Sequence, residues 1–171
     1  MKKKTLLVLC GCIFLIFMIP ILVKGVALFL FSSASKWKSA AEYEKYEEQF
    51  GVVKDYIFEL CGGSCQRHFY IEYWQEQDRI LYDLDLEKYF EVPENIYDAL
   101  MVLTENAFPD SEARLSQIYV QENRIVFDSK AGYALVWSPD EKPTWLYSPD
   151  EERDISVKKA GDGWYHFVID P

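Results

Sequence analysis

The sequence predicts an α+β fold, in which a membrane anchor precedes one domain of two helices and an antiparallel sheet. Three observations support this fold class. Residues 5–31 form an almost unbroken apolar stretch, two later segments carry apolar residues at helical spacing, and the other segments alternate apolar and polar residues in short runs. Helices and strands that are not in strict alternation, with short turns between the strands, are typical of an α+β domain.

The first 38 residues predict the anchor. Residues 1–4 are a basic amino-terminal tail, and the 19 residues from 5 to 23 carry no charged side chain. At about 1.5 Å rise per residue, such a helix is about 28 Å long, close to the roughly 30 Å hydrocarbon core of a bilayer. We therefore expect a transmembrane anchor over residues 5–31, which attaches the protein to the membrane, and a juxtamembrane linker over residues 32–38.

A cleaved signal peptide is the alternative interpretation, with Ser32–Ala34 as a small-residue cleavage site. Signal peptides have apolar regions of about 7 to 15 residues, so the longer stretch favours a retained anchor. Three lysines precede the span and three follow it within residues 24–38, so the positive-inside rule does not decide the orientation. The short basic tail before a first apolar helix predicts a single-pass protein of the cell membrane, with the amino terminus inside and the carboxy-terminal domain outside.

Charge separates this anchor from the acidic α+β domain expected over residues 39–171. The chain has 18 basic and 28 acidic residues, and residues 1–38 contain six lysines and no acid. The domain therefore holds 12 basic and 28 acidic residues, a net charge of −16. This charge argues against binding to nucleic acid or to anionic lipid, because both need clustered Lys and Arg. A basic ligand is compatible with it, but a solvated surface is the simpler explanation of the composition.

The domain begins with a long amphipathic helix. Ser39–Glu42 has the spacing of a capping box, and Gly62–Gly63 would end the helix because glycine accepts positive φ. A second helix is expected to begin at Pro93 and to end before Pro109. The two apolar stripes expected to face the sheet are Tyr43, Tyr46, Phe50, Val53, Ile57 and Leu60 in the first helix and Ile96, Leu100, Leu103 and Ala107 in the second.

The remaining segments predict strands. Residues 67–74 and 79–86 read as a β-hairpin, with Tyr82 on one face of the second strand and Asp83 and Asp85 on the other. After the second helix we expect a carboxy-terminal antiparallel β-meander, because short turns join consecutive strands. Its strands are predicted over residues 115–121, 124–129, 133–138, 144–148, 155–159 and 164–169.

Cys61 and Cys65 enclose a Gly-Gly-Ser bend, which allows the two thiols to meet. Outside the cytoplasm, a disulfide closing this five-residue loop is the expected state. A redox role fits less well, because thioredoxin-type motifs have two intervening residues. A metal site that adds His68 lacks an obvious fourth ligand.

No catalytic motif stands out, and we expect no cofactor and no metal. Asp83, Asp85 and Glu72 could serve acid–base chemistry in a hydrolase, but strand alternation explains their spacing. Residues 150–154 resemble a calcium loop only at their acidic positions, because the Gly and Glu that such a loop needs further on are missing.

Aromatic residues make up 16% of the chain. Trp137, Trp145, Tyr147 and Trp164 fall in the late strands, where they form either core or a surface that holds a sugar ring or a partner's apolar side chain. The sequence therefore predicts a membrane-anchored domain that binds a protein, a basic ligand or a surface polymer. A membrane-tethered hydrolase that uses scattered carboxylates is the alternative.

Overall fold

The chain divides after Lys38, and the unit from Ser39 to Pro171 contains every residue placed by the computed structural model. The structure describes residues 40–62, 65–72, 80–108, 114–129, 132–140, 142–143 and 154–169. The predicted anchor and linker lie outside these residues. Within them, no helix has the length and apolar character that a membrane crossing requires.

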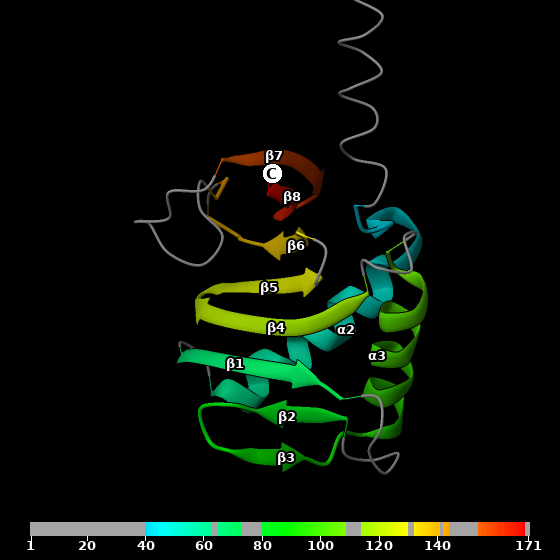
Figure 1. Cartoon of the computed structure of the whole chain (residues 1–171), viewed down its shortest axis with the longest axis vertical. Coiled ribbons are helices and arrows are strands. Elements are labelled where there is room, and N and C mark those ends of the chain that lie inside the picture. Colours follow the sequence, from blue (N-terminus) through cyan, green and yellow to red (C-terminus); the bar gives the residue numbers. More distant parts are fainter. Residues whose placement is uncertain are drawn as a thin grey trace, which may run out of the picture. The chain divides into compact units, whose positions relative to one another are not determined.

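The described part of the domain consists of two helices and one antiparallel sheet of eight strands, which confirms the α+β class. Both helices lie on the same face of the sheet (Figure 1). The strand order is β3-β2-β1-β4-β5-β6-β8-β7, and all neighbours are antiparallel. In chain order the elements are α2 (Tyr43–Cys61), β1 (Cys65–Ile71), β2 (Leu81–Asp83), β3 (Lys88–Phe90), α3 (Glu94–Asn106), β4 (Leu115–Glu122), β5 (Arg124–Ser129), β6 (Tyr133–Trp137), β7 (Ile155–Gly161) and β8 (Trp164–Ile169).

Both predicted helices are present with the predicted stripes facing the sheet. α2 ends at Cys61, and the Gly62 that follows has a φ of 64°, the left-handed conformation expected of a glycine at a helix end. The expected capping box is not used, because α2 begins only at Tyr43 and the preceding Glu42 makes no side-chain cap. Instead, the Glu42 backbone N–H donates to the Ala107 carbonyl at 2.7 Å, which ties the start of α2 to the end of α3.

The predicted faces of the second strand of the hairpin are reversed. β1 and β2 are antiparallel as expected, but β2 spans only Leu81–Asp83, and a turn leads to a strand, β3, that the sequence pattern did not predict. Leu81 and Asp83 face the helices and are fully buried, whereas Tyr82 faces the other way. The buried carboxylate is tolerated because the Arg67 guanidinium of β1 pairs with it.

The late strands are not a simple meander. β4, β5 and β6 are consecutive neighbours, but β6 pairs with β8, so β7 takes the edge of the sheet. The predicted strand over residues 144–148 lies outside the described residues. The Gly161–Gly163 turn joins β7 to β8 as expected, and Gly163 has a φ of 70°.

The main core fills the space between the helices and the sheet. Its fully buried side chains include Phe50, Ile57, Leu100, Ile118 and Phe127. The opposite face of the sheet divides into two halves. Over β5, β6 and β8 it carries a smaller buried apolar cluster, made of Val126, Ala134, Val136 and Phe167. Over β1, β2, β3 and β4 the same face is polar and aromatic.

Candidate functional site

Five aromatic rings cross the four strands β3, β2, β1 and β4 on the sheet face that does not carry the helices. The register places Tyr89 opposite Tyr82, Tyr82 opposite Tyr70, and His68 opposite Tyr119. Because successive side chains of a strand alternate between faces, all five rings lie on one face. We call Tyr89, Tyr82, Tyr70, His68 and Tyr119 the aromatic row.

The rings contact one another in two groups, with Tyr119, His68 and Tyr70 in one and Tyr82 and Tyr89 in the other. The His68 and Tyr119 rings stack with centroids 3.8 Å apart and an angle of 21° between the planes. The centroids of His68 and Tyr70 are 5.0 Å apart, and those of Tyr82 and Tyr89 are 4.8 Å apart. Tyr89 is 37% exposed and the other four rings are half-buried, so the row is a fixed surface that solvent reaches.

Polar side chains hold the rings in place. The Gln117 side-chain carbonyl accepts a hydrogen bond from the Tyr119 hydroxyl at 2.9 Å, and His68 Nε2 lies 3.1 Å from the same oxygen. At the other end, the Tyr89 hydroxyl donates to Glu72 at 2.6 Å. A hollow of about 400 Å³ adjoins the His68 end of the row and is lined by Gln66, Arg67, His68, Asp85, Tyr119, Val120 and Gln121.

Burial shifts the pKa values of two rings of the row away from their ordinary values. Burial raises the pKa of Tyr119 to about 12, with further contributions from Asp128 and Tyr70. Burial also lowers the pKa of His68 below its ordinary value of 6.5, and the contacts with Gln117 and Asp85 offset only part of this shift. Tyr119 therefore keeps its phenolic proton at pH 7 and the lowered pKa leaves the His68 imidazole uncharged, so neither ring adds a charge to the surface.

The tryptophans expected to form a binding surface lie elsewhere. Trp164 is 5% exposed and contacts Tyr43 and Phe50 in the main core, with ring centroids 5.3 and 5.8 Å away. Trp137 is half-buried on the helix side, where it meets the Phe58 ring at 5.4 Å and Lys54 Nζ at 4.5 Å. Of the two interpretations offered by the sequence, core or binding surface, core therefore applies to Trp137 and Trp164. Trp145 and Tyr147 lie outside the described residues.

The aromatic row was missed at the sequence level although it leaves a signal. His68 and Tyr70 alternate with buried Phe69 in β1, and Tyr119 alternates with buried Ile118 and Val120 in β4. Two strands with ring-bearing residues on their polar face indicate an aromatic surface only when they are known to be neighbours. That pairing joins residues about 50 positions apart, which sequence alternation alone cannot specify.

The carboxylates of the hydrolase alternative do not converge on a cavity. Asp83 is fully buried on the helix side and bound to Arg67, and its Oδ1 accepts the backbone N–H groups of Asp85 and Leu86 at 2.9 Å each. The Asp85 carboxylate accepts the His68 backbone N–H at 2.7 Å. Among the described residues, no group of three or more His, Cys, Asp or Glu side chains could hold a metal ion.

The two loop cysteines stand at the junction of α2 and β1. Cys61 is the last residue of α2 and Cys65 is the first residue of β1. The side chain of Cys65 is not described, so the disulfide stays a prediction. His68, which the metal alternative required, lies on the sheet face away from α2 with its ring bonded to Gln117.

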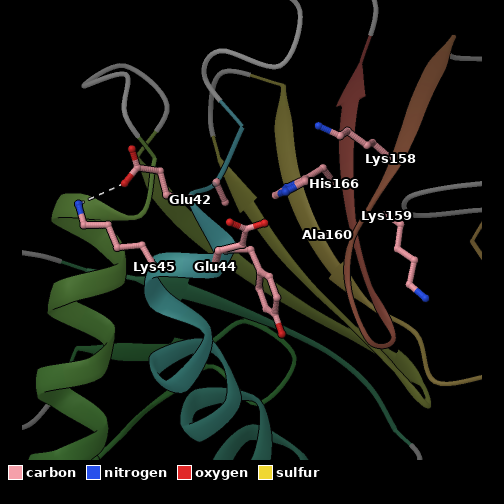
Figure 2. Close-up of a pocket in the computed structure, with 9 residues that line it drawn as sticks. Glu42, Glu44, Lys45, Lys158, Lys159, Ala160 and His166 are labelled. Atoms are coloured by element: carbon pink, nitrogen blue, oxygen red, sulfur yellow. Dashed lines mark hydrogen bonds and ion pairs between the residues drawn. The ribbon is translucent and has the colours of Figure 1, made fainter. Parts of the chain in front are cut away.

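A second hollow, of about 390 Å³, lies between the start of α2 and the strands β7 and β8. Figure 2 shows Glu42 and Glu44 on one side and Lys158 and His166 on the other. Burial, with a smaller contribution from nearby Lys158, lowers the pKa of His166 to about 4, so this imidazole is neutral at pH 7. The surrounding charges are of both signs, and Lys45 already pairs with Glu42 at 3.2 Å, so the hollow does not select a ligand charge.

Comparison of the chain with protein-family models, with curated proteins and with solved structures gave no match. The functional interpretation therefore depends on the geometry described above.

Proposed function

We propose that this protein is a single-pass membrane protein that presents a non-catalytic binding domain outside the cytoplasm, and that the domain binds its partner through the aromatic row. One observation carries the proposal: five rings lie on adjacent strands of one solvent-accessible sheet face that the helices leave uncovered. Monomeric soluble domains seldom expose an aromatic surface of this kind unless it is used.

The residue types of the row support binding. Tyrosine gives a large contact area with few rotatable bonds, so little conformational entropy is lost when a partner orders it. Its hydroxyl keeps the free surface hydrated, and such residues are enriched at the centres of binding surfaces. Because the rings within each of the two groups already contact one another, they are preorganised, which lowers the cost of association further.

The membrane part of the proposal has separate support. The apolar stretch over residues 5–31 is long enough to span a bilayer, and the basic tail over residues 1–4 is the expected cytoplasmic flank. The Cys61–Cys65 pair fits an oxidising compartment. The acidic charge of residues 39–171 keeps the domain off anionic head groups, so that its surface stays available to a partner.

The topology is tested with an epitope tag at the carboxy terminus of the full chain. Antibody should reach the tag on intact cells whose outer barriers have been removed, and the protein should remain in the membrane fraction after alkaline washing. Labelling only after permeabilisation would reverse the orientation, and release by the alkaline wash would show that residues 5–31 do not span the membrane.

The role of the aromatic row is tested on the same tagged protein by exchanging Tyr82 for Leu. The exchange keeps an apolar side chain of similar size but removes the ring and the hydroxyl. We expect crosslinking of the domain to its partner on cells to fall at least tenfold, with membrane level and topology unchanged. Tyr97→Leu on α3 is the matched control, because Tyr97 is also half-buried but lies on the helix side. Equal crosslinking by both variants would refute the proposal.

A further inference from the structure

The charges around the aromatic row indicate which ligand it accepts. Glu72 contacts the Tyr89 hydroxyl at one end of the row. At the other end, Asp85 lines the hollow next to His68 and Tyr119, and Asp128 is close enough to Tyr119 to raise the pKa of its hydroxyl. Carboxylates therefore stand at both ends of the row.

The cations of the same strands lie on the opposite face of the sheet. Arg67 of β1 is held on the helix side by Asp83 and lies 5.1 Å from the Phe69 ring centroid. Lys88 of β3 covers the Phe90 ring at 4.5 Å, also on the helix side. In the described residues of β1, β2, β3 and β4, no Lys or Arg alternates onto the face that bears the row. Arg67 does line the hollow beside His68, and Arg124 of the neighbouring strand β5 is buried on the row's face opposite Gln121.

We propose that the aromatic row binds a basic, extended segment of a partner protein, with guanidinium groups of the segment placed against the tyrosine rings. This inference rests on the proposed function and specifies the partner's chemistry. It follows from charge complementarity: π faces attract cations, the flanking carboxylates add to that attraction, and the strand positions that bear the rings carry no Lys or Arg. Arginine suits the site better than lysine, because its planar group stacks on a ring and can fork to a carboxylate at the same time.

The dimensions of the row agree with such a segment. Strands of a sheet are about 4.8 Å apart, so the row spans about 14 Å across its four strands. In an extended peptide, side chains on one face repeat about every 6.6 to 6.8 Å. Two or three arginines at alternate positions would therefore reach the row together, and the acidic groups at its ends would lie beside the outer ones.

The test uses the full chain in nanodiscs of neutral phosphatidylcholine, so that lipid does not bind the probe. The probe is a fluorescent nonapeptide of alternating Arg and Ser, followed by anisotropy. We expect Tyr82→Leu to weaken binding at least tenfold, Tyr82→Phe to keep it within about twofold, and Glu72→Gln to weaken it at least threefold. Tyr97→Leu and Asp98→Asn on α3 are the matched controls and should leave binding unchanged. Circular dichroism of each variant checks that the domain is folded.

Three outcomes would overturn the inference. Equal losses from Asp98→Asn and Glu72→Gln would mean that the peptide responds only to net charge. The second outcome is that the peptide does not bind, whereas a neutral hexasaccharide binds and Tyr82→Leu abolishes that binding. The row would then keep its binding function, but its partner would be a sugar polymer and not a basic segment. Peptide binding that Tyr82→Leu leaves intact would place the basic segment elsewhere on the domain and count against the proposed function of the row as well.

Discussion

Replacing Asp83 with Asn should destabilise the domain by about 3 kcal/mol, because it removes one partner of a buried ion pair. The Asp83 side chain is 0% exposed and that of Arg67 is 13% exposed. Arg67 would keep its hydrogen bond to the Leu60 carbonyl at 3.1 Å, but its second terminal nitrogen would face an amide in place of a carboxylate. The isosteric change leaves the packing of β2 almost unaltered, so the loss isolates the charge.

The magnitude follows from the contacts. Breaking a buried pair by removing one partner costs about 3 to 5 kcal/mol, and the partial exposure of Arg67 places this case at the lower end. The Asn carbonyl can still accept the two backbone N–H groups that Asp83 Oδ1 accepts now. Asp83→Ala loses these as well, at about 1 kcal/mol each, so it should cost about 5 kcal/mol in total.

The assay is urea unfolding of a fragment covering residues 39–171, followed by tryptophan fluorescence. This fragment should fold alone, because both buried clusters are built from side chains between Ala41 and Ile169. Asp98→Asn, an exposed change on α3, is the matched control and should stay within about 0.5 kcal/mol. A double variant that adds Arg67→Met to Asp83→Asn should cost less than the sum of the single changes, because neither charge is then left alone.

A loss below 1 kcal/mol for Asp83→Asn, or strict additivity in the double variant, would refute the buried pair. The hydrolase alternative would regain support if the variant were as stable as the parent.

Three further predictions address other parts of the domain. His166→Gln should flatten the pH dependence of the unfolding free energy between pH 6.5 and 4. The pKa of His166 is about 4 in the folded state and about 6.5 in the unfolded state, so the parent loses roughly 2 kcal/mol of stability as the pH falls through that window. Urea titrations at several pH values would measure this loss. Gly161→Ala should destabilise by about 1 to 3 kcal/mol, because a Cβ there would lie 2.4 Å from Tyr43 Cε1, and a melting temperature unchanged from the parent would contradict that contact. Protein purified from its native compartment without reductant should give a peptide spanning Cys61 and Cys65 that is lighter than the reduced peptide by two hydrogens in mass spectrometry. Alkylation of both thiols would rule the disulfide out.

The sequence was sufficient for the elements that have a clear period. The stripe of α2 was predicted because Phe50, Val53 and Ile57 recur at helical spacing, and all three are fully buried. The bounds of β5 and β8 were predicted to the residue, since turn residues flank them closely. Local pattern determines such elements, so no knowledge of distant contacts was needed.

Properties that depend on distant partners could not be predicted in this way. The reversed faces of β2 follow from Arg67, which neutralises Asp83 across the sheet and thereby allows a charged residue on the buried side. Local alternation also cannot predict that β8 lies beside β6. The connection between β6 and β7 is long enough for either β7 or β8 to take the edge of the sheet. The burial of Trp164 also depends on a distant contact. Alternation shows that Trp164 shares a face with His166, but it does not show that α2 covers that face at Trp164.

The distribution of residues over the sheet face opposite the helices argues that the aromatic row is a surface of use and not an unfinished core. The half over β5, β6 and β8 is closed by aliphatic and Phe side chains that are at most 5% exposed, against which the half-buried rings of Tyr119 and Tyr165 pack. The other half could have been built in the same way, yet it carries tyrosine, histidine and glutamine, whose polar atoms tolerate water. Tyrosine hydroxyls that bond to Gln117 and Glu72 fix the rings without covering them. A face that is ordered by its own hydrogen bonds, yet left open to solvent, has its binding geometry in place before any partner arrives.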